Sequence, residues 1–231
     1  MSRAPIIAID GPSGSGKGTV SRAVAAELGW RLLDSGALYR LVALAARKAG
    51  AALEDGPGLA RLAERTDFRF GAAPAGGEMV WLDGADVTLA VRTETAGNDA
   101  SKIAALPELR AALLQRQRDF AEPPGLVADG RDMGTVVFPT AEVKIFLTAS
   151  AEERAGRRYK QLKEKGVAAT LAALSTEIAE RDRRDTTRSA SPLVASADAV
   201  LLDTTGMSVE AVVGRILEVA RGRLQIESRK D

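Results

Sequence analysis

Short apolar runs alternate with longer amphipathic segments along most of the chain. Such runs are typical of strands that are buried on both faces of a parallel sheet. Five strands are expected, and four of them end in aspartate. Because open α/β sheets bind ligands at the carboxyl ends of their strands, these aspartates mark the edge where we expect a site. The predicted strands are residues 6–10, 31–34, 125–129, 143–148 and 199–203.

The segments between these runs carry the end signals of helices. Pro107 suits a first helical position, and Ser150 with Glu153 forms a capping-box pattern. The alternation of strands and helices predicts an α/β protein with a five-stranded parallel sheet flanked by helices. The expected helices lie at about residues 16–28, 37–49, 107–120, 151–165, 171–185 and 208–224.

One stretch departs from this alternation. Short runs at 67–70, 79–82 and 87–89 have the pattern of antiparallel strands, with turn-forming residues at 71–77 and at Asp83-Gly84. They predict a small inserted β lobe, and a chain of 231 residues fits one domain with such an insertion. We expect a single domain over 1–231, with a core at about 1–62, 104–150 and 190–231, a lobe at about 63–103 and a helical lid at about 151–189.

The composition excludes much of the catalysis that proteins perform with their own nucleophiles and bases. The chain contains no cysteine and no histidine. These absences rule out disulfides, zinc sites with Cys or His ligands, Ser-His triads and thiol nucleophiles. Phosphoryl transfer remains, because it depends on positioning and on charge stabilisation by backbone N–H groups, Lys, Arg, carboxylates and Mg²⁺.

Charge and hydropathy bear on partners and location. The chain has 32 Lys and Arg against 31 Asp and Glu, and the net charge of +1 creates no global field for nucleic acid or anionic membranes. Its apolar runs are too short for a signal-peptide core or a membrane span. We therefore expect a cytoplasmic protein with no nucleic-acid or membrane partner. A monomer is also expected, although no feature of the sequence determines the oligomeric state.

The most specific motif follows the first predicted strand and opens the first predicted helix. Gly11, four further residues, Gly16 and Lys17 match the spacing of a P-loop, which predicts a P-loop NTPase-type sheet. Glycines let successive backbone N–H groups face phosphate oxygens, and the helix N-terminus and the lysine add positive charge. A glycine-rich turn without a ligand is the alternative, and the strand-to-helix context disfavours it. The predicted ATP-binding residues are Gly11, Pro12, Ser13, Gly14, Ser15, Gly16, Lys17, Gly18 and Thr19.

The motif departs from many P-loops at the position after the lysine. Gly18 stands where Ser or Thr often binds Mg²⁺, and the hydroxyl comes one residue later, at Thr19. Asp129 ends a predicted strand next to the one that bears the P-loop, a layout that places a carboxylate near Mg²⁺. We expect Thr19 and Asp129 to hold the ion, partly through water.

Polar residues also follow two other predicted strands. Ser35, Tyr39 and Arg40 offer a hydroxyl, a ring and a guanidinium, although an ordinary helix cap with a surface arginine fits them equally well. Arg131 follows the strand that ends at Asp129 and offers a planar fork suited to phosphate. A solvated turn is the alternative there.

Arginines cluster on two of the predicted helices. Arg181, Asp185 and Arg188 recur at helical spacing, so they share one face. Arg154, Arg157 and Arg158 form a second cluster. Such charges usually lie in solvent, but neighbouring guanidinium groups repel one another unless an anion lies between them. A lid that closes over polyphosphate would supply that anion.

Together these motifs closely resemble the bacterial cytidylate kinases, within the nucleoside monophosphate kinase family. The resemblance runs from Pro5 to about Arg221 and includes the Gly-Lys-Gly-Thr form of the P-loop and the inserted lobe. It implies a single kinase domain, with the lobe on the acceptor side. The segments that carry the resemblance are 11–19, 32–40, 129–135, 143–147 and 180–185.

This resemblance implies transfer of the γ-phosphoryl group of ATP to CMP or dCMP, with Mg²⁺, in pyrimidine nucleotide metabolism. Lys17, Arg131, Arg188 and Asp129 would be the catalytic residues, and Arg157 and Arg158 would bind ATP from the lid. The implied acceptor residues are Ser35, Arg110 and Asp132 near the cytosine, with Tyr39 beside them, Ser101, Arg181 and Asp185 at the pentose, and Arg40, Arg131 and Arg188 at the phosphate.

Other functions stay open at this stage. A P-loop kinase for UMP or another small acceptor would keep the glycine loop but differ in its acceptor residues. A noncatalytic ATP-binding switch would bind nucleotide and form no product. RNA binding by the arginine-rich helices is disfavoured, because no basic patch interleaved with aromatic residues supports it.

Overall fold

The computed structural model describes residues 4–72, 78–164 and 168–224. It divides into two compact units, Met1–Asp34 with Arg118–Asp231 and Ser35–Gln117, and each is described by itself. Within the described residues, no helix is both long and apolar enough to cross a membrane.

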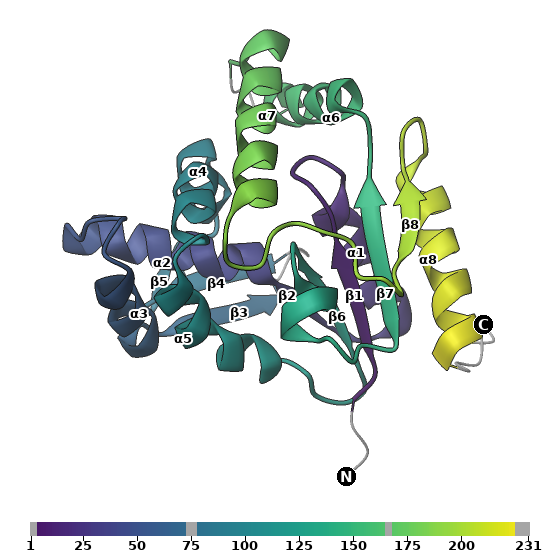
Figure 1. The fold of residues 1–231 in the computed structure, drawn as a ribbon, viewed down its shortest axis with the longest axis horizontal. Helices are drawn as coiled ribbons and strands as arrows, with labels where there is room; N and C mark the ends of the chain where they lie inside the picture. The colour runs from purple at the N-terminus through teal and green to yellow at the C-terminus, as the bar shows by residue number, and fades with distance from the viewer. Residues whose placement is uncertain (1–3, 73–77, 165–167, 225–231) are drawn as a thin grey trace. The chain divides into compact units, whose positions relative to one another are not determined.

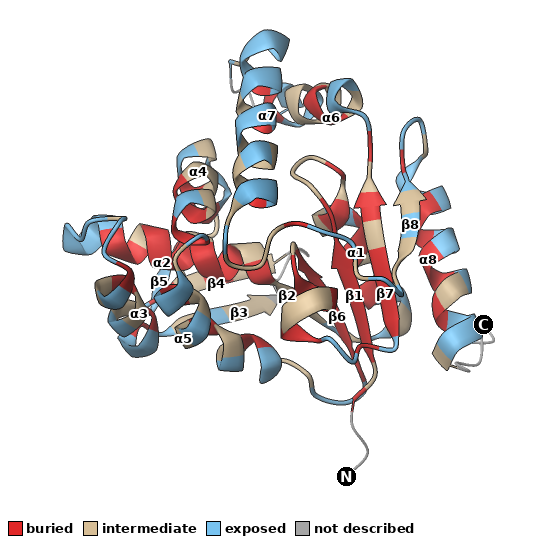
Figure 2. Cartoon of the chain, in the orientation of Figure 1, coloured by how far each residue is buried: buried red, intermediate tan, exposed pale blue. Residues whose placement is uncertain are grey.

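The first unit contains a parallel sheet whose central strand leads into the glycine loop. Its strand order is β2-β6-β1-β7-β8, and all neighbouring strands run parallel (Figure 1). The inner strands are almost wholly buried, as their apolar sequences predict (Figure 2). Parallel strands end at the same edge, so the residues that follow β1 and β6 are neighbours. The strands are β1 (Ile6–Asp10), β2 (Arg31–Asp34), β6 (Leu126–Gly130), β7 (Val143–Thr148) and β8 (Val200–Asp203).

Two helices, α1 and α8, cover one face of this sheet. Ile7 and Ile9 of β1 lie in one core cluster with Val20 and Val24 of α1 and Ile216 of α8. Residues two apart on a strand point to the same face, so both helices pack against that face. Helices α6 and α7 pack on each other. The helical elements are α1 (Lys17–Leu28), a π-helical turn η2 (Met133–Val137), α6 (Ala151–Glu164), α7 (Leu171–Thr187) and α8 (Val209–Leu224).

The second unit combines a three-stranded antiparallel sheet with helices. Leu41 of α2, Val80 and Leu82 of β4 and Val91 of η1 form its core. This sheet confirms the predicted antiparallel strands at 67–70 and 79–82, whereas the division of the chain into core, lobe and lid stays a prediction. The elements are α2 (Ser35–Ala49), α3 (Gly56–Arg65), β3 (Phe68–Ala72), β4 (Glu78–Leu82), β5 (Ala85–Asp86), a 3₁₀ turn η1 (Ala90–Arg92), α4 (Glu94–Ile103) and α5 (Pro107–Arg118).

The predicted strand at 87–89 is wrong. The third strand is instead β5, which ends at Asp86. Val87 still donates to the carbonyl oxygen of Val80, but the N–H of Val80 then donates to the side-chain Oγ1 of Thr88 at 2.9 Å. Because a hydroxyl replaces the next backbone carbonyl, the ladder stops there. Residues 73–77 of the predicted turn lie outside the described residues.

Candidate active site

The glycine loop joins β1 to α1 at the centre of the sheet. Gly11 and Gly16 have φ angles of 150° and 89°, which side chains rarely allow. A Cβ added to Gly11 would lie 2.1 Å from the carbonyl oxygen of Leu147, so no larger residue fits. Gly16 is the N-cap of α1 and offers no capping side chain. The first N–H groups of α1 therefore depend on another acceptor, and a phosphate group is one that helix N-termini bind.

Lys17, the first residue of α1, is buried and folds back over the loop. Its Nζ donates to the carbonyl oxygen of Pro12 at 2.8 Å, and Ser15 Oγ donates to the same oxygen at 3.0 Å. Burial lowers the pKa of Lys17 from 10.5 to about 7, and Arg131 acts in the same direction, although Asp129 opposes them. A bound anion favours the charged form of a neighbouring amine. Polyphosphate would therefore restore the charge that burial disfavours.

Asp10, the last residue of β1, is a buried carboxylate that the sequence-based site left out. Its Oδ1 accepts from the N–H of Met133 and its Oδ2 from the N–H of Gly134, both at 2.8 Å. Burial raises the pKa of Asp10 from 3.8 to about 6, although these two hydrogen bonds lower it. Arg131 and Asp132 directly precede this segment. Asp10 thus fixes the backbone beside two residues that are predicted to bind the phosphoryl acceptor. Its position as the last residue before the glycine loop could have indicated a role in the site.

Asp129 lies beside the beginning of α1, where it fits a Mg²⁺ ligand. A Cβ on Gly18 would lie only 3.3 Å from a carboxylate oxygen of Asp129. In the register of the sheet, Asp129 is the partner of Asp34 in β2. Thr19 is exposed. The described residues contain no group of three or more Asp or Glu side chains that could hold a metal. Mg²⁺ often binds through one or two carboxylates with phosphate and water oxygens, and this arrangement suits that mode.

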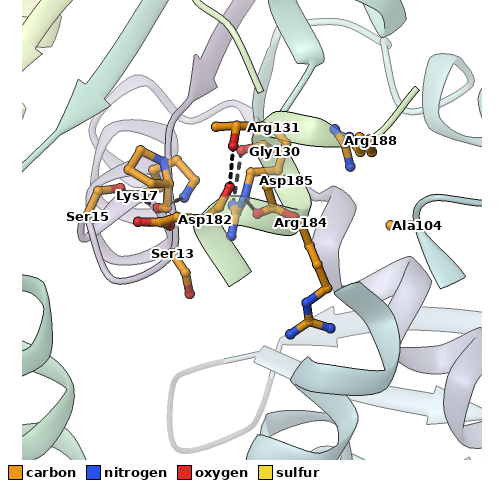
Figure 3. Close-up of polar contacts among 12 residues, drawn as sticks. Ser13, Ser15, Lys17, Ala104, Gly130, Arg131, Asp182, Arg184, Asp185 and Arg188 are labelled. Atoms are coloured by element: carbon orange, nitrogen blue, oxygen red, sulfur yellow. Dashed lines mark hydrogen bonds and ion pairs between the residues drawn. The ribbon is translucent and has the colours of Figure 1, made fainter. Parts of the chain in front are cut away.

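The loop after β6 is joined to α7 by an ion pair between two residues that are predicted to bind the phosphoryl acceptor. Arg131 Nε donates to Asp185 Oδ2 at 2.9 Å, and Asp185 is buried (Figure 3). Asp132, which follows Arg131, is also buried. The pair fixes the direction of the Arg131 fork, which planar bidentate recognition of phosphate requires.

Arg154 of α6 contacts both the glycine loop and α7, and sequence reasoning did not assign it to the site. It is buried, and its guanidinium donates to the carbonyl oxygens of Ala149 at 3.1 Å and Ser13 at 3.0 Å. It also pairs with Asp182 of α7 at 2.6 Å. Arg154 therefore ties the glycine loop to both helices of the predicted lid.

Arg157 binds the other side of the glycine loop. It donates to the carbonyl oxygen of Ser15 at 3.2 Å and to Thr204 Oγ1 at 3.0 Å, and it pairs with Glu153 at 3.0 Å. Arg158 contacts Gln161. Carboxylates of the protein lie beside two members of this cluster, Asp182 at Arg154 and Glu153 at Arg157. Binding of ATP by Arg157 and Arg158 stays a prediction. Thr204 gave no sequence signal, since its strand end is remote from every motif.

The two predicted acceptor arginines of the α7 region have partners near them in sequence. Arg181 pairs with Glu177 one helical turn earlier, at 3.2 Å. Arg188 caps α7 and its Nε donates to the carbonyl oxygen of Ser191. Arg181 and Asp185 both lie within α7, as their spacing predicts. The predicted helical face does not extend to Arg188, because α7 ends at Thr187 and the backbone of Arg188 is extended.

The second unit contains the remaining residues that are predicted to bind the phosphoryl acceptor. Ser35 Oγ donates to Gln117 Oε1 at 2.7 Å. The guanidinium of Arg110 lies 6.0 Å from the ring centroid of Tyr39, and it donates to the carbonyl oxygen of Ala104 at 3.1 Å. The structure thus brings Arg110 and Tyr39 together, and it adds Gln117, which no motif had indicated.

Arg40 and Ser101 lie on α2 and α4. Arg40 Nε donates to the carbonyl oxygen of Gly36 at 3.1 Å. The Oγ atom of Ser101 is buried and has no hydrogen-bond partner within the described part of the chain. A buried hydroxyl usually has a partner, so Ser101 fits a position that a ligand hydroxyl completes.

These features define a P-loop kinase, with a glycine loop on the central strand of a parallel sheet and arginine-rich helices above it. A family model described as cytidylate kinase matches residues 7–222. The cytidylate kinase of Stutzerimonas stutzeri (strain A1501) is 61% identical over 94% of this chain and 95% of its own length. That of Marinomonas sp. (strain MWYL1) is 54% identical over 97% of this chain and 99% of its own length. The chain belongs to the cytidylate kinase family.

Proposed function

We propose that the protein transfers the γ-phosphoryl group of ATP to CMP or dCMP, giving ADP and CDP or dCDP. Its family supports these acceptors, and the glycine loop with Lys17 supports ATP as the donor. The reaction is a direct in-line transfer, in which positioning and charge stabilisation lower the barrier. The acceptor phosphate is already an anion, so the absence of histidine and cysteine is no obstacle.

The donor phosphates bind at the beginning of α1. Backbone N–H groups between Gly11 and Gly16 surround them, and Lys17 turns from the Pro12 carbonyl to the β- and γ-phosphate oxygens. Arg157 supports the loop from the Ser15 carbonyl, and Arg158 on the same helix contributes further positive charge.

Mg²⁺ neutralises charge on the β- and γ-phosphate oxygens when it is bound. Asp129 would hold the ion, because its carboxylate lies against Gly18 at the beginning of α1. Thr19 would contribute through water, since its side chain is exposed.

The acceptor is recognised by three kinds of group. Arg40, Arg131 and Arg188 bind its phosphate, and Arg131 and Arg188 also stabilise the charge of the transition state. Asp132 accepts a hydrogen bond from the cytosine amino group, whereas uracil presents an oxygen at that position. The remaining residues of the proposed set are Ser35, Tyr39 and Arg110 at the base and Ser101, Arg181 and Asp185 at the pentose.

The observation that carries this proposal is the buried ammonium group of Lys17 in the glycine loop, for which polyphosphate is the matching anion. A coupled assay of ADP formation with CMP, dCMP, UMP, AMP and shikimate tests it. We expect turnover with CMP and dCMP to exceed turnover with the other acceptors. ATP binding without diphosphate formation from any acceptor would contradict the proposal. Size-exclusion chromatography would test the expected monomer.

A further inference from the structure

Gln117 and Ser35 form a buried pair within the second unit. Ser35 is the first residue of α2 and Gln117 lies near the end of α5, and their side-chain oxygens are 2.7 Å apart. Ser35 is 4% exposed and Gln117 is 2% exposed. Water therefore does not compete for this hydrogen bond, and its direction decides what the serine offers to a ligand.

The orientation of the Gln117 amide follows from its second contact. Its Nε2 donates to the backbone carbonyl oxygen of Leu113 at 3.4 Å. A carbonyl oxygen has no proton to donate, so the amide nitrogen must face Leu113. The amide oxygen then faces Ser35, and the hydroxyl proton of Ser35 must point to it.

A serine hydroxyl carries one proton and two acceptor lone pairs. Because Gln117 takes that proton, Ser35 can only accept a hydrogen bond from a further partner. We propose that Gln117 is a positioning residue for base choice: it makes Ser35 an acceptor only, which favours a base that presents an amino group over one that presents a carbonyl oxygen. This inference rests on the proposed function, in which Ser35 meets the cytosine.

The test is the ratio of kcat/KM for CMP to that for UMP. In Gln117→Met the proton acceptor is lost while the length of the side chain is retained, so the Ser35 hydroxyl can turn and donate to the uracil oxygen. We expect the CMP-to-UMP ratio to fall about tenfold, chiefly through a gain with UMP. Gln115→Met is the matched control, because Gln115 is exposed on the same helix, and the ratio should not change.

A purely structural role of Gln117 predicts a different result. Loss of packing would lower kcat/KM for both nucleotides by the same factor and leave their ratio unchanged, and that outcome overturns the inference. Ser35→Ala provides a second test should Gln117→Met fold poorly. It removes the acceptor itself, so the CMP-to-UMP ratio should again fall, and an unchanged ratio contradicts the inference.

The double variant connects the two residues. In the Ser35→Ala background, Gln117→Met should change the ratio no further, because no hydroxyl remains to be oriented. An additional drop of the same size would show that Gln117 acts without Ser35 and would overturn the inference. Wild-type protein that phosphorylates neither CMP nor dCMP would instead refute the proposed function, so the two failures are distinguishable.

Discussion

Asp10 Oδ2 accepts a hydrogen bond from the backbone N–H of Gly134 at 2.8 Å, so the strand that begins the glycine loop is bonded directly to η2. The other carboxylate oxygen of Asp10 accepts from Met133. Two consecutive N–H groups thus share one carboxylate. This arrangement fixes the chain immediately after Arg131 and Asp132. Asp10 is therefore a candidate for positioning these two residues toward the phosphoryl acceptor.

Asp10→Asn should weaken the binding of the phosphoryl acceptor CMP more than the binding of the donor ATP. An amide has one oxygen, so one of the two N–H groups loses its acceptor and the segment that carries Arg131 loosens. We expect KM for CMP to rise about fivefold, with a smaller change in KM for ATP, because a net hydrogen bond is worth about 1 kcal/mol. Steady-state kinetics with each substrate varied in turn measures both. An equal rise in the two KM values would contradict this role.

Asp10 should also give the free protein a specific pH dependence. Its folded-state pKa of about 6 exceeds the ordinary 3.8, so the folded state retains a proton that the unfolded state loses between these values. The contribution is therefore fully present below about pH 4, and it is lost as pH rises to about 6, by about 3 kcal/mol in total.

Urea unfolding from pH 4 to pH 8, without nucleotide, measures this contribution. The free energy of unfolding of wild type minus that of Asp10→Asn isolates it, because other carboxylates titrate in both proteins. The difference should decrease up to about pH 6 and stay constant above it. A difference that rises with pH would show that Asp10 has a lowered pKa instead.

Lys17→Met should lower kcat by about a hundredfold or more, because it removes one charge-stabilising donor from the transferred group. Lys48→Met is the control, since Lys48 is exposed at the end of α2. Circular dichroism checks that both variants fold. Near-normal turnover of a folded Lys17→Met protein would refute the role of this lysine.

Two glycine substitutions should change stability in opposite directions. Gly11→Ala places a Cβ 2.1 Å from the Leu147 carbonyl oxygen, and we expect a loss of about 3 kcal/mol or failure to fold. Gly214→Ala lies within α8, where an added Cβ meets nothing within 4 Å, and it should stabilise by about 0.5–1 kcal/mol. Thermal unfolding measures both, and comparable melting temperatures for the two variants would contradict the prediction.

Arg154→Ala should destabilise the protein by about 3 kcal/mol, because it leaves Asp182 and the Ser13 carbonyl without their buried partner. Arg215→Ala removes an exposed ion pair with Glu218 and should cost less than about 0.5 kcal/mol. Denaturant unfolding compares the two. Equal losses would mean that the Arg154 contacts are no stronger than those of a surface pair.

The sheet and the glycine loop could be predicted because local sequence determines them. The five parallel strands lie within one residue of their expected positions, since each is a short apolar run bounded by polar residues. Helices α3 and α4 were not predicted, because their local sequences lack the usual signals of a helix. The Gly56-Pro-Gly58 start of α3 is typical of a turn, yet Asp55 caps it by accepting from the N–H of Gly58 at 2.9 Å. In α4, burial of small residues such as Ala96 and Ala100 compensates for a weak apolar pattern.

Partners that are distant in sequence could not be predicted. The carboxylate of Asp10 meets N–H groups more than a hundred positions away, and Ser35 and Gln117 are separated by 82. Such contacts depend on the packing of whole elements rather than on a motif. For the same reason the sequence gave no sign of the hydrogen bond between Arg157 and Thr204.

The hydrogen bond between Ser35 and Gln117 joins the first and last residues of the second unit. The two ends of this unit are therefore held together by its own side chains. Chain ends that lie close together are typical of units that can be inserted into a longer polypeptide.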